Sequence, residues 1–193
     1  MPLILIFTPY LNNLKGVFRE ERVAPAPVVP LGTFSRLKRF SICFCRNIKK
    51  LFTPGLMQNL EQIQVYDCEQ LEEIIGGAEA SDDEVEEEEA KEIVKIFPQL
   101  RKLILRGLPE LKTICSSSNV ILCDSLDSID IEQCPKLKRL PLSLHLIDGE
   151  RSSPPSSLRI KIEKEWWELL EWDNHDMKMV LEPLCQFRED EWV

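Results

Sequence analysis

The stretch that decides the fold is Leu60-Glu-Gln-Ile-Gln-Val-Tyr-Asp-Cys-Glu-Gln-Leu-Glu-Glu-Ile74. Ile63 and Val65 alternate with polar residues, which predicts a short strand with one buried face. Cys68 stands at the next apolar position, where a small thiol fits a chain that turns inward. The stretch therefore predicts one strand followed by a turn back into a core.

The same six-position apolar frame recurs along the chain, in copies that begin at residues 37, 60, 100 and 126. Two of the intervals fall in the range of about 20 to 29 residues that leucine-rich repeats have, and the longer interval contains an acidic run. The predicted fold class is an α/β repeat solenoid with a curved parallel β-sheet. We expect an irregular or short-helical convex side and a Trp-rich C-terminal cap. The anchors are Leu37, Phe40, Ile42, Cys45, Ile48 and Leu51; Leu60, Ile63, Val65, Cys68, Leu71 and Ile74; Leu100, Leu103, Leu105, Leu108, Leu111 and Ile114; and Leu126, Ile129, Ile131, Cys134, Leu137 and Leu140.

The repeat array is expected to span residues 1–163, followed by a cap and tail over 164–193. Within the array we expect a partial copy (1–20), a proline-rich spacer (21–32), repeats at 34–56, 57–78, 97–119 and 123–145, an acidic loop (79–92) and a final strand (156–163). In the cap, Trp166, Leu169 and Leu170 stand at helical spacing with glutamates between them, which predicts an amphipathic turn that lays these three residues over the end of the sheet. Because a solenoid end needs a polar capping unit and this chain starts on strand positions, we expect a fragment whose preceding repeats are absent.

The distribution of charge along the chain indicates which classes of binding partner are disfavoured. The chain has 193 residues, 33 acidic and 24 basic side chains and a net charge of -9. Residues 79–92 hold nine acids and one lysine, so the remaining chain is nearly neutral. Nucleic acid and membrane surfaces are disfavoured because no extended surface of one sign is expected, although Arg101, Lys102 and Arg106 form a local basic group. Seven cysteines, an odd number, and no Asn-x-Ser/Thr sequon favour the cytoplasm.

Catalytic and metal chemistry find little support. His145 and His175 are the only histidines, and neither stands beside a plausible nucleophile. The pair Cys43 and Cys45 has no second pair at ligand spacing, and the frame assigns Cys45 to the core. The phosphate-binding pattern Gly-x-x-x-x-Gly-Lys-Ser/Thr is absent from the sequence. We therefore expect no enzyme activity, no cofactor and no metal, and a recognition role instead.

The residues that flank the strand anchors would form the concave face, the usual recognition surface of a solenoid. Lys38, Glu61, Arg101 and Asp127 occupy equivalent positions and alternate in sign. This alternation favours a ladder of ion pairs between repeats over a charge-patterned ligand surface. The candidate binding residues are Lys38, Arg39, Phe44, Glu61, Gln62, Gln64, Tyr66, Arg101, Lys102, Arg106, Asp127, Asp130 and Glu132.

Three phrases of the chain resemble plant coiled-coil, nucleotide-binding, leucine-rich-repeat (NBS-LRR) disease resistance proteins, in their C-terminal repeat region. They are the stretch beginning at Leu60, the stretch Phe97-Pro-Gln-Leu-Arg-Lys-Leu-Ile-Leu-Arg-Gly-Leu-Pro-Glu-Leu-Lys, and the tail Trp166-Trp167-Glu-Leu-Leu-Glu-Trp172-Asp173. The resemblance implies an intracellular immune receptor whose repeats hold the receptor off and sense a pathogen effector or a guarded host protein. ADP or ATP would bind only in the family's nucleotide-binding domain, a further partner of the repeats in a full receptor.

Two alternatives remain. The chain could be a repeat domain of a ubiquitin-ligase substrate adaptor, a class that also uses Cys-type repeats. A hydrolase using Cys43 and His145 is the third hypothesis.

Overall fold

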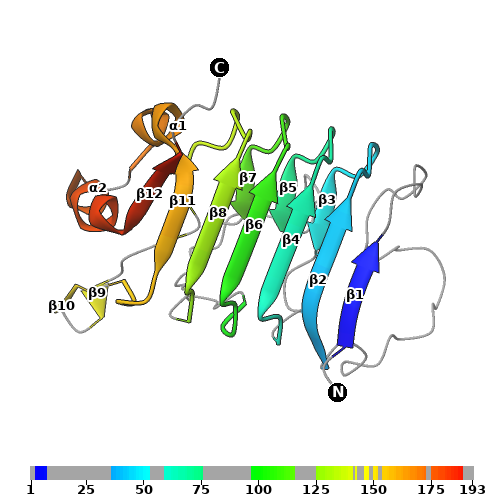
Figure 1. Ribbon diagram of the computed structural model, residues 1–193, viewed down its shortest axis with the longest axis horizontal. Helices are drawn as coiled ribbons and strands as arrows, with labels where there is room; N and C mark the ends of the chain where they lie inside the picture. Colours follow the sequence, from blue (N-terminus) through cyan, green and yellow to red (C-terminus); the bar gives the residue numbers. More distant parts are fainter. Residues whose placement is uncertain are drawn as a thin grey trace, which may run out of the picture.

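Seven parallel strands form the large sheet of the protein (Figure 1). The computed structural model describes residues 3–7, 36–52, 59–75, 97–115, 125–140, 142, 146–147, 150–151, 154–172 and 175–188. The strands, in sheet order, are β1 (Leu3–Phe7), β2 (Leu37–Cys43), β4 (Gln62–Tyr66), β6 (Lys102–Arg106), β8 (Ser128–Glu132), β11 (Arg159–Glu163) and β12 (Cys185–Arg188). Up to β11 the sheet order follows the chain order of the repeats, as the frame predicts for a solenoid.

A second layer of three short parallel strands lies behind the large sheet (Figure 1). They are β3 (Lys50–Phe52), β5 (Glu73–Ile75) and β7 (Thr113–Cys115). On the convex side, which was expected to be irregular or short-helical, these repeats contain three-residue strands that pair with one another. Each of these segments contains a buried apolar residue, and Lys50 lies 3.5 Å from Glu73 on the neighbouring strand. Because the repeats are stacked, these short segments lie side by side, and their backbones pair as parallel strands where a short helix was an alternative.

The core lies between the two layers and consists of the predicted anchors. All six anchors of each of the first three full copies are buried, as are five of the fourth, while Leu140 is partly buried. Cys45, Cys68 and Cys134 are buried among the apolar anchors, as expected. Across the sheet, Phe40 pairs with Ile63 and Ile63 with Leu103. The frame thus corresponds to the buried face of each strand.

Each described repeat turns inward through one left-handed residue placed just before the Cys or Leu anchor. Phe44, Asp67, Gly107 and Gln133 have φ angles of 56°, 50°, 63° and 54°. A Cβ on Gly107 would lie 2.3 Å from Asp67 Oδ1, so this turn has no room for a side chain in the present arrangement. The backbone N–H of the first three turn residues continues the sheet: Phe44 donates to Tyr66 O, Asp67 to Arg106 O and Gly107 to Glu132 O.

The C-terminal segment covers the last repeat. Helices α1 (Lys164–Leu169) and α2 (His175–Leu181), and the 3-10 turn η1 (Glu182–Leu184), lead into β12, which pairs with β11. Trp166 Nε1 donates a hydrogen bond of 2.7 Å to Leu137 O, which satisfies a carbonyl at the open end of the second layer. In the large sheet, the Glu163 carboxylate accepts a hydrogen bond from the backbone N–H of Gln133. In the preceding repeat the equivalent N–H, that of Gly107, donates to the backbone carbonyl of Glu132.

One expectation for this cap was wrong. Leu169 is 75% exposed, whereas Trp167 is fully buried and packs edge-on against Trp172 with ring centroids 4.7 Å apart. Helix α1 has only six residues, so its inward face is set by the two adjacent tryptophans and Leu170 rather than by a long amphipathic stripe.

Several expectations concern other parts of the chain. β1 lies within residues 1–20, where the partial copy was expected. A short antiparallel pair, β9 (Leu146–Ile147) with β10 (Glu150–Arg151), was not predicted. The proline-rich spacer, the acidic loop and His145 lie outside the described residues.

Candidate functional site

The candidate surface is the face of the large sheet that points away from the core, here called the open face. It carries every second residue of each strand: Arg39, Ser41 and Cys43; Gln62, Gln64 and Tyr66; Lys102, Ile104 and Arg106; Ser128, Asp130 and Glu132; and Arg159, Lys161 and Glu163. Because the strands are in register, these residues form rows across the sheet. The buried face beneath these rows is apolar in every repeat, whereas the residue types on the open face differ from strand to strand.

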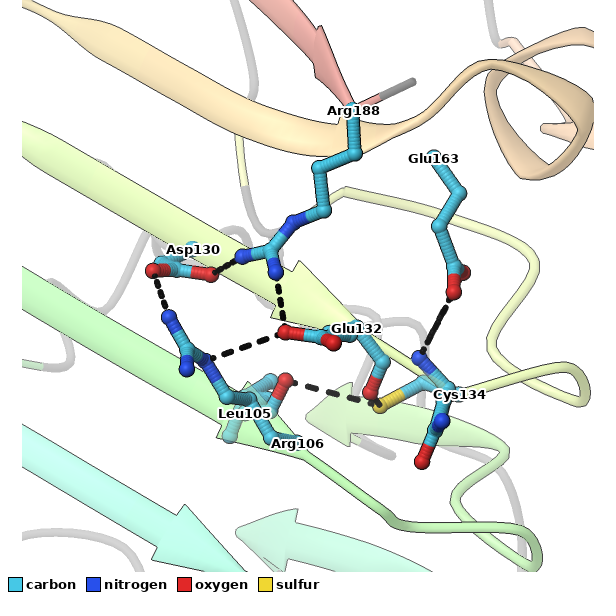
Figure 2. Close-up of polar contacts among 8 residues, drawn as sticks. Leu105, Arg106, Asp130, Glu132, Cys134, Glu163 and Arg188 are labelled. Atoms are coloured by element: carbon cyan, nitrogen blue, oxygen red, sulfur yellow. Dashed lines mark hydrogen bonds and ion pairs between the residues drawn. The ribbon is translucent and has the colours of Figure 1, made fainter. Parts of the chain in front are cut away.

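A cluster of four charged residues occupies one end of the open face (Figure 2). Arg106 Nη2 donates to Asp130 Oδ2 over 2.6 Å, and Arg106 Nε lies 3.4 Å from Glu132 Oε2. Arg188 reaches from β12 across β11 and contacts the same two carboxylates. The hydrogen bond from Arg106 to Asp130 raises the pKa of the Arg106 guanidinium. Two arginines and two carboxylates thus neutralise one another, and this cluster links three strands.

The predicted ladder is present in two of its pairings. Lys38 Nζ lies 2.9 Å from Glu61 Oε1, and Arg101 Nη1 lies 3.3 Å from Asp127 Oδ2. The hydrogen bond from Lys38 lowers the pKa of Glu61. The pairs confirm that opposite charges on neighbouring repeats contact one another. Similar pairs follow the convex side, where Glu72 lies 3.4 Å from Lys49 and 2.6 Å from Lys112 on the two flanking repeats.

The other candidate residues separate into a strand group and a turn residue. Gln62, Gln64 and Tyr66 are half-buried side by side along β4. Burial raises the pKa of Tyr66, and its protonated hydroxyl can donate or accept a hydrogen bond at neutral pH. Phe44 does not lie on a strand: it occupies the left-handed turn after β2 and is 52% exposed.

The thiols of Cys45, Cys68 and Cys134 lie in the core. Burial raises the pKa of Cys68 and of Cys134 to about 12. Cys43 is half-buried on the open face, in register with Tyr66. No group of three or more His, Cys, Asp or Glu side chains is placed to hold a metal ion within the described residues. None of the helices described is long and apolar enough to cross a membrane.

Sequence reasoning missed four residues of this surface. Arg159, Lys161 and Glu163 continue the rows of β8 onto β11, and Arg188 joins the ion cluster. The alternation around Ile160 and Ile162 was the available signal for the first three. For Arg188 there was no local signal, because β12 is too short to show a pattern and reaches the sheet only after two helices.

The chain matches the family described as "Plant disease resistance protein RPS2-like, leucine-rich repeats" over residues 12–145. It is 34% identical over 149 residues to the putative disease resistance protein At4g10780 of Arabidopsis thaliana, which covers 76% of this chain and 16% of that protein. It is 31% identical over 159 residues to the disease resistance protein SUMM2 of the same plant, which covers 81% of this chain and 16% of that protein. No solved structure matches significantly.

The relatives are thus much longer than the matched part: the chain spans about one sixth of these two proteins. The family match, the repeat frame and the stacked strands all concern the same region. The chain therefore belongs to the leucine-rich-repeat family of plant disease resistance proteins.

Proposed function

We propose that this chain is the protein-recognition region of an intracellular plant immune receptor. Its ligand is a protein, either a pathogen effector or a guarded host protein, and it binds on the open face. In a full receptor the same repeats contact the nucleotide-binding domain and help to hold the receptor off. The role is binding rather than catalysis, and it takes place in the cytoplasm.

One observation carries this proposal: the two faces of the large sheet differ in chemistry. The buried face carries apolar anchors on every repeat, whereas the open face changes from strand to strand. Across one row its residues are Ser41, Gln64, Ile104, Asp130 and Lys161. A constant support beneath a varied, partly exposed surface suits specific binding.

A photo-crosslinking experiment tests the proposal. Benzoylphenylalanine is placed at Gln64, half-buried in the middle of the open face, and in a control chain at Gln70, exposed in the turn of the same repeat. Both chains are expressed in leaf cells with and without pathogen challenge, and adducts are identified by mass spectrometry. We expect a protein adduct at position 64 that position 70 does not give. Equal adducts at both positions, or none at position 64, contradict the proposal.

A further inference from the structure

One row of the open face differs in the arrangement of its charges from the ladder of Lys38, Glu61, Arg101 and Asp127 that runs beside it. This row, here called the basic row, consists of Arg39, Gln62, Lys102, Ser128 and Arg159, which are neighbours in register across β2, β4, β6, β8 and β11. In the neighbouring ladder, cations alternate with acids. In the basic row, cations alternate with the neutral residues Gln62 and Ser128.

None of the three cations forms an ion pair with a carboxylate among the described residues, although the charge of Arg39 helps to lower the pKa of Glu61 at longer range. All three are exposed. The described ion pairs involve neither Arg39 nor Lys102, and Arg159 Nη1 donates only to two backbone carbonyls nearby, those of Ser156 and Leu158. Glu61 and Asp127, the acids that directly precede Gln62 and Ser128 in the chain, are already paired with Lys38 and Arg101.

The remaining charges of the open face largely cancel. Arg106 and Arg188 neutralise Asp130 and Glu132, as described above. Of the charges that remain on β11, Lys161 and Glu163 contribute one of each sign. The uncompensated charge of the described face is therefore positive and concentrated in the basic row, although the whole chain has a net charge of -9.

We propose that the basic row binds an acidic polypeptide segment of the protein ligand, whose carboxylates take the places that Gln62 and Ser128 leave without charge. The inference rests on the proposed recognition function and names the chemistry of its partner. Neighbouring strands lie about 4.8 Å apart, so cations on alternate strands are separated by about 9.5 Å. A polyproline II segment with an acid at every third residue presents its carboxylates at about 9.3 Å intervals. A nucleic acid is the less favoured occupant, because the ladder and the ion cluster place carboxylates on both sides of the basic row.

The test supplies the missing charges from within the chain. The probe is a fluorescein-labelled peptide of four Pro-Ala-Glu repeats, with Pro-Ala-Gln repeats as the control peptide, and binding to the full chain is measured by fluorescence anisotropy. The double variant Gln62→Glu, Ser128→Glu completes the alternation in the basic row. The matched control, Gln70→Glu with Leu169→Glu, adds the same charge at exposed sites outside the open face.

We expect the double variant to lose affinity for the acidic peptide by about tenfold or more, since several ion pairs are lost together, with an unchanged or higher melting temperature. The control variant should bind as the unaltered chain does, and binding should weaken with added salt. Equal binding by the double variant, no binding of the acidic peptide to the unaltered chain, or tighter binding of a (dT)12 oligonucleotide would overturn the inference.

The crosslinking experiment separates this inference from the proposed function. If the adduct at position 64 persists unchanged in the Gln62→Glu, Ser128→Glu background, the basic row does not hold the ligand but the open face still does. If that adduct is absent in every background, the recognition function itself fails.

Discussion

Trp166 and Trp167 are neighbours in α1 and differ in one respect that can be measured. Trp166 Nε1 donates to Leu137 O over 2.7 Å, in a buried contact. Trp167 Nε1 is buried and has no hydrogen-bond partner among the described residues. Replacing either residue by phenylalanine removes the same atoms. The difference between the two variants reports the hydrogen bond of Trp166, set against the edge-on ring contacts that Trp167 makes with Trp172 and Phe187.

In Trp166→Phe the carbonyl of Leu137 loses its donor while the rest of the cap still covers it. Leaving a buried polar group without a partner costs about 1–3 kcal/mol, and the smaller ring adds a packing cost. In Trp167→Phe the packing cost is offset, because a buried donor without a partner is removed. We expect Trp166→Phe to lower the free energy of unfolding by about 1–3 kcal/mol more than Trp167→Phe.

Urea denaturation followed by far-UV circular dichroism measures this difference, and equal m-values for the two variants establish that the same unit unfolds. The reasoning is refuted if both variants lose the same stability, or if Trp167→Phe loses more. Either result would mean that packing of the cap, and not satisfaction of the Leu137 carbonyl, holds the C-terminal segment on the last repeat.

Three further predictions follow from the charges and thiols. Arg188→Gln, compared with Lys161→Gln as the exposed control, should lower the free energy of unfolding by about 1.5–3 kcal/mol, because two carboxylates lose a charged donor; equal effects in urea titrations would argue against the cluster. Because ion pairing lowers the pKa of Glu61 below its unfolded value, the pair contributes stability above that value and loses it as the pH falls through the folded value. The urea midpoint should therefore fall below about pH 4.5, and fall less in Lys38→Gln; identical pH profiles for the two chains would count against the ladder. Since burial raises the pKa of Cys68 and of Cys134 to about 12, iodoacetamide at pH 8 should leave both unmodified until urea is added, as peptide mass spectrometry can check; labelling in the folded protein would contradict their place in the core.

The sequence predicted the large sheet because its signal is local and repeated. Anchors such as Ile63 and Val65 keep one side of each strand apolar, and the residue between them therefore faces the other side. The same logic predicted the contact between Lys38 and Glu61, since equivalent positions of successive repeats become neighbours once the repeats stack. The family resemblance was confirmed for the same reason, because the frame and its flanking residues carry it.

The missed features depend on contacts that no short pattern records. β12 joins the sheet only after two helices have crossed the end of the array, and Arg188 finds its partners two strands away. Helix α1 is so short that helical spacing placed Leu169 inward, while packing against Trp172 and Phe187 selected Trp167 instead. For the candidate surface, the sequence indicated the residues of β2 to β8 but not which of them neutralise one another.

The alternation of charge between repeats restricts how such an array can change its length. Removing the repeat that carries β4 would remove Glu61 and bring Lys38 against Arg101. On the convex side the same deletion would remove Glu72, which contacts both Lys49 and Lys112, and would bring these two lysines together. Like charges on adjacent strands are destabilising. Removing two successive repeats would instead leave Lys38 facing Asp127. Along the ladder, the deletion of two repeats is therefore expected to be tolerated better than the deletion of one, whereas on the convex side either deletion would place Lys49 against another lysine, Lys112 or Lys138.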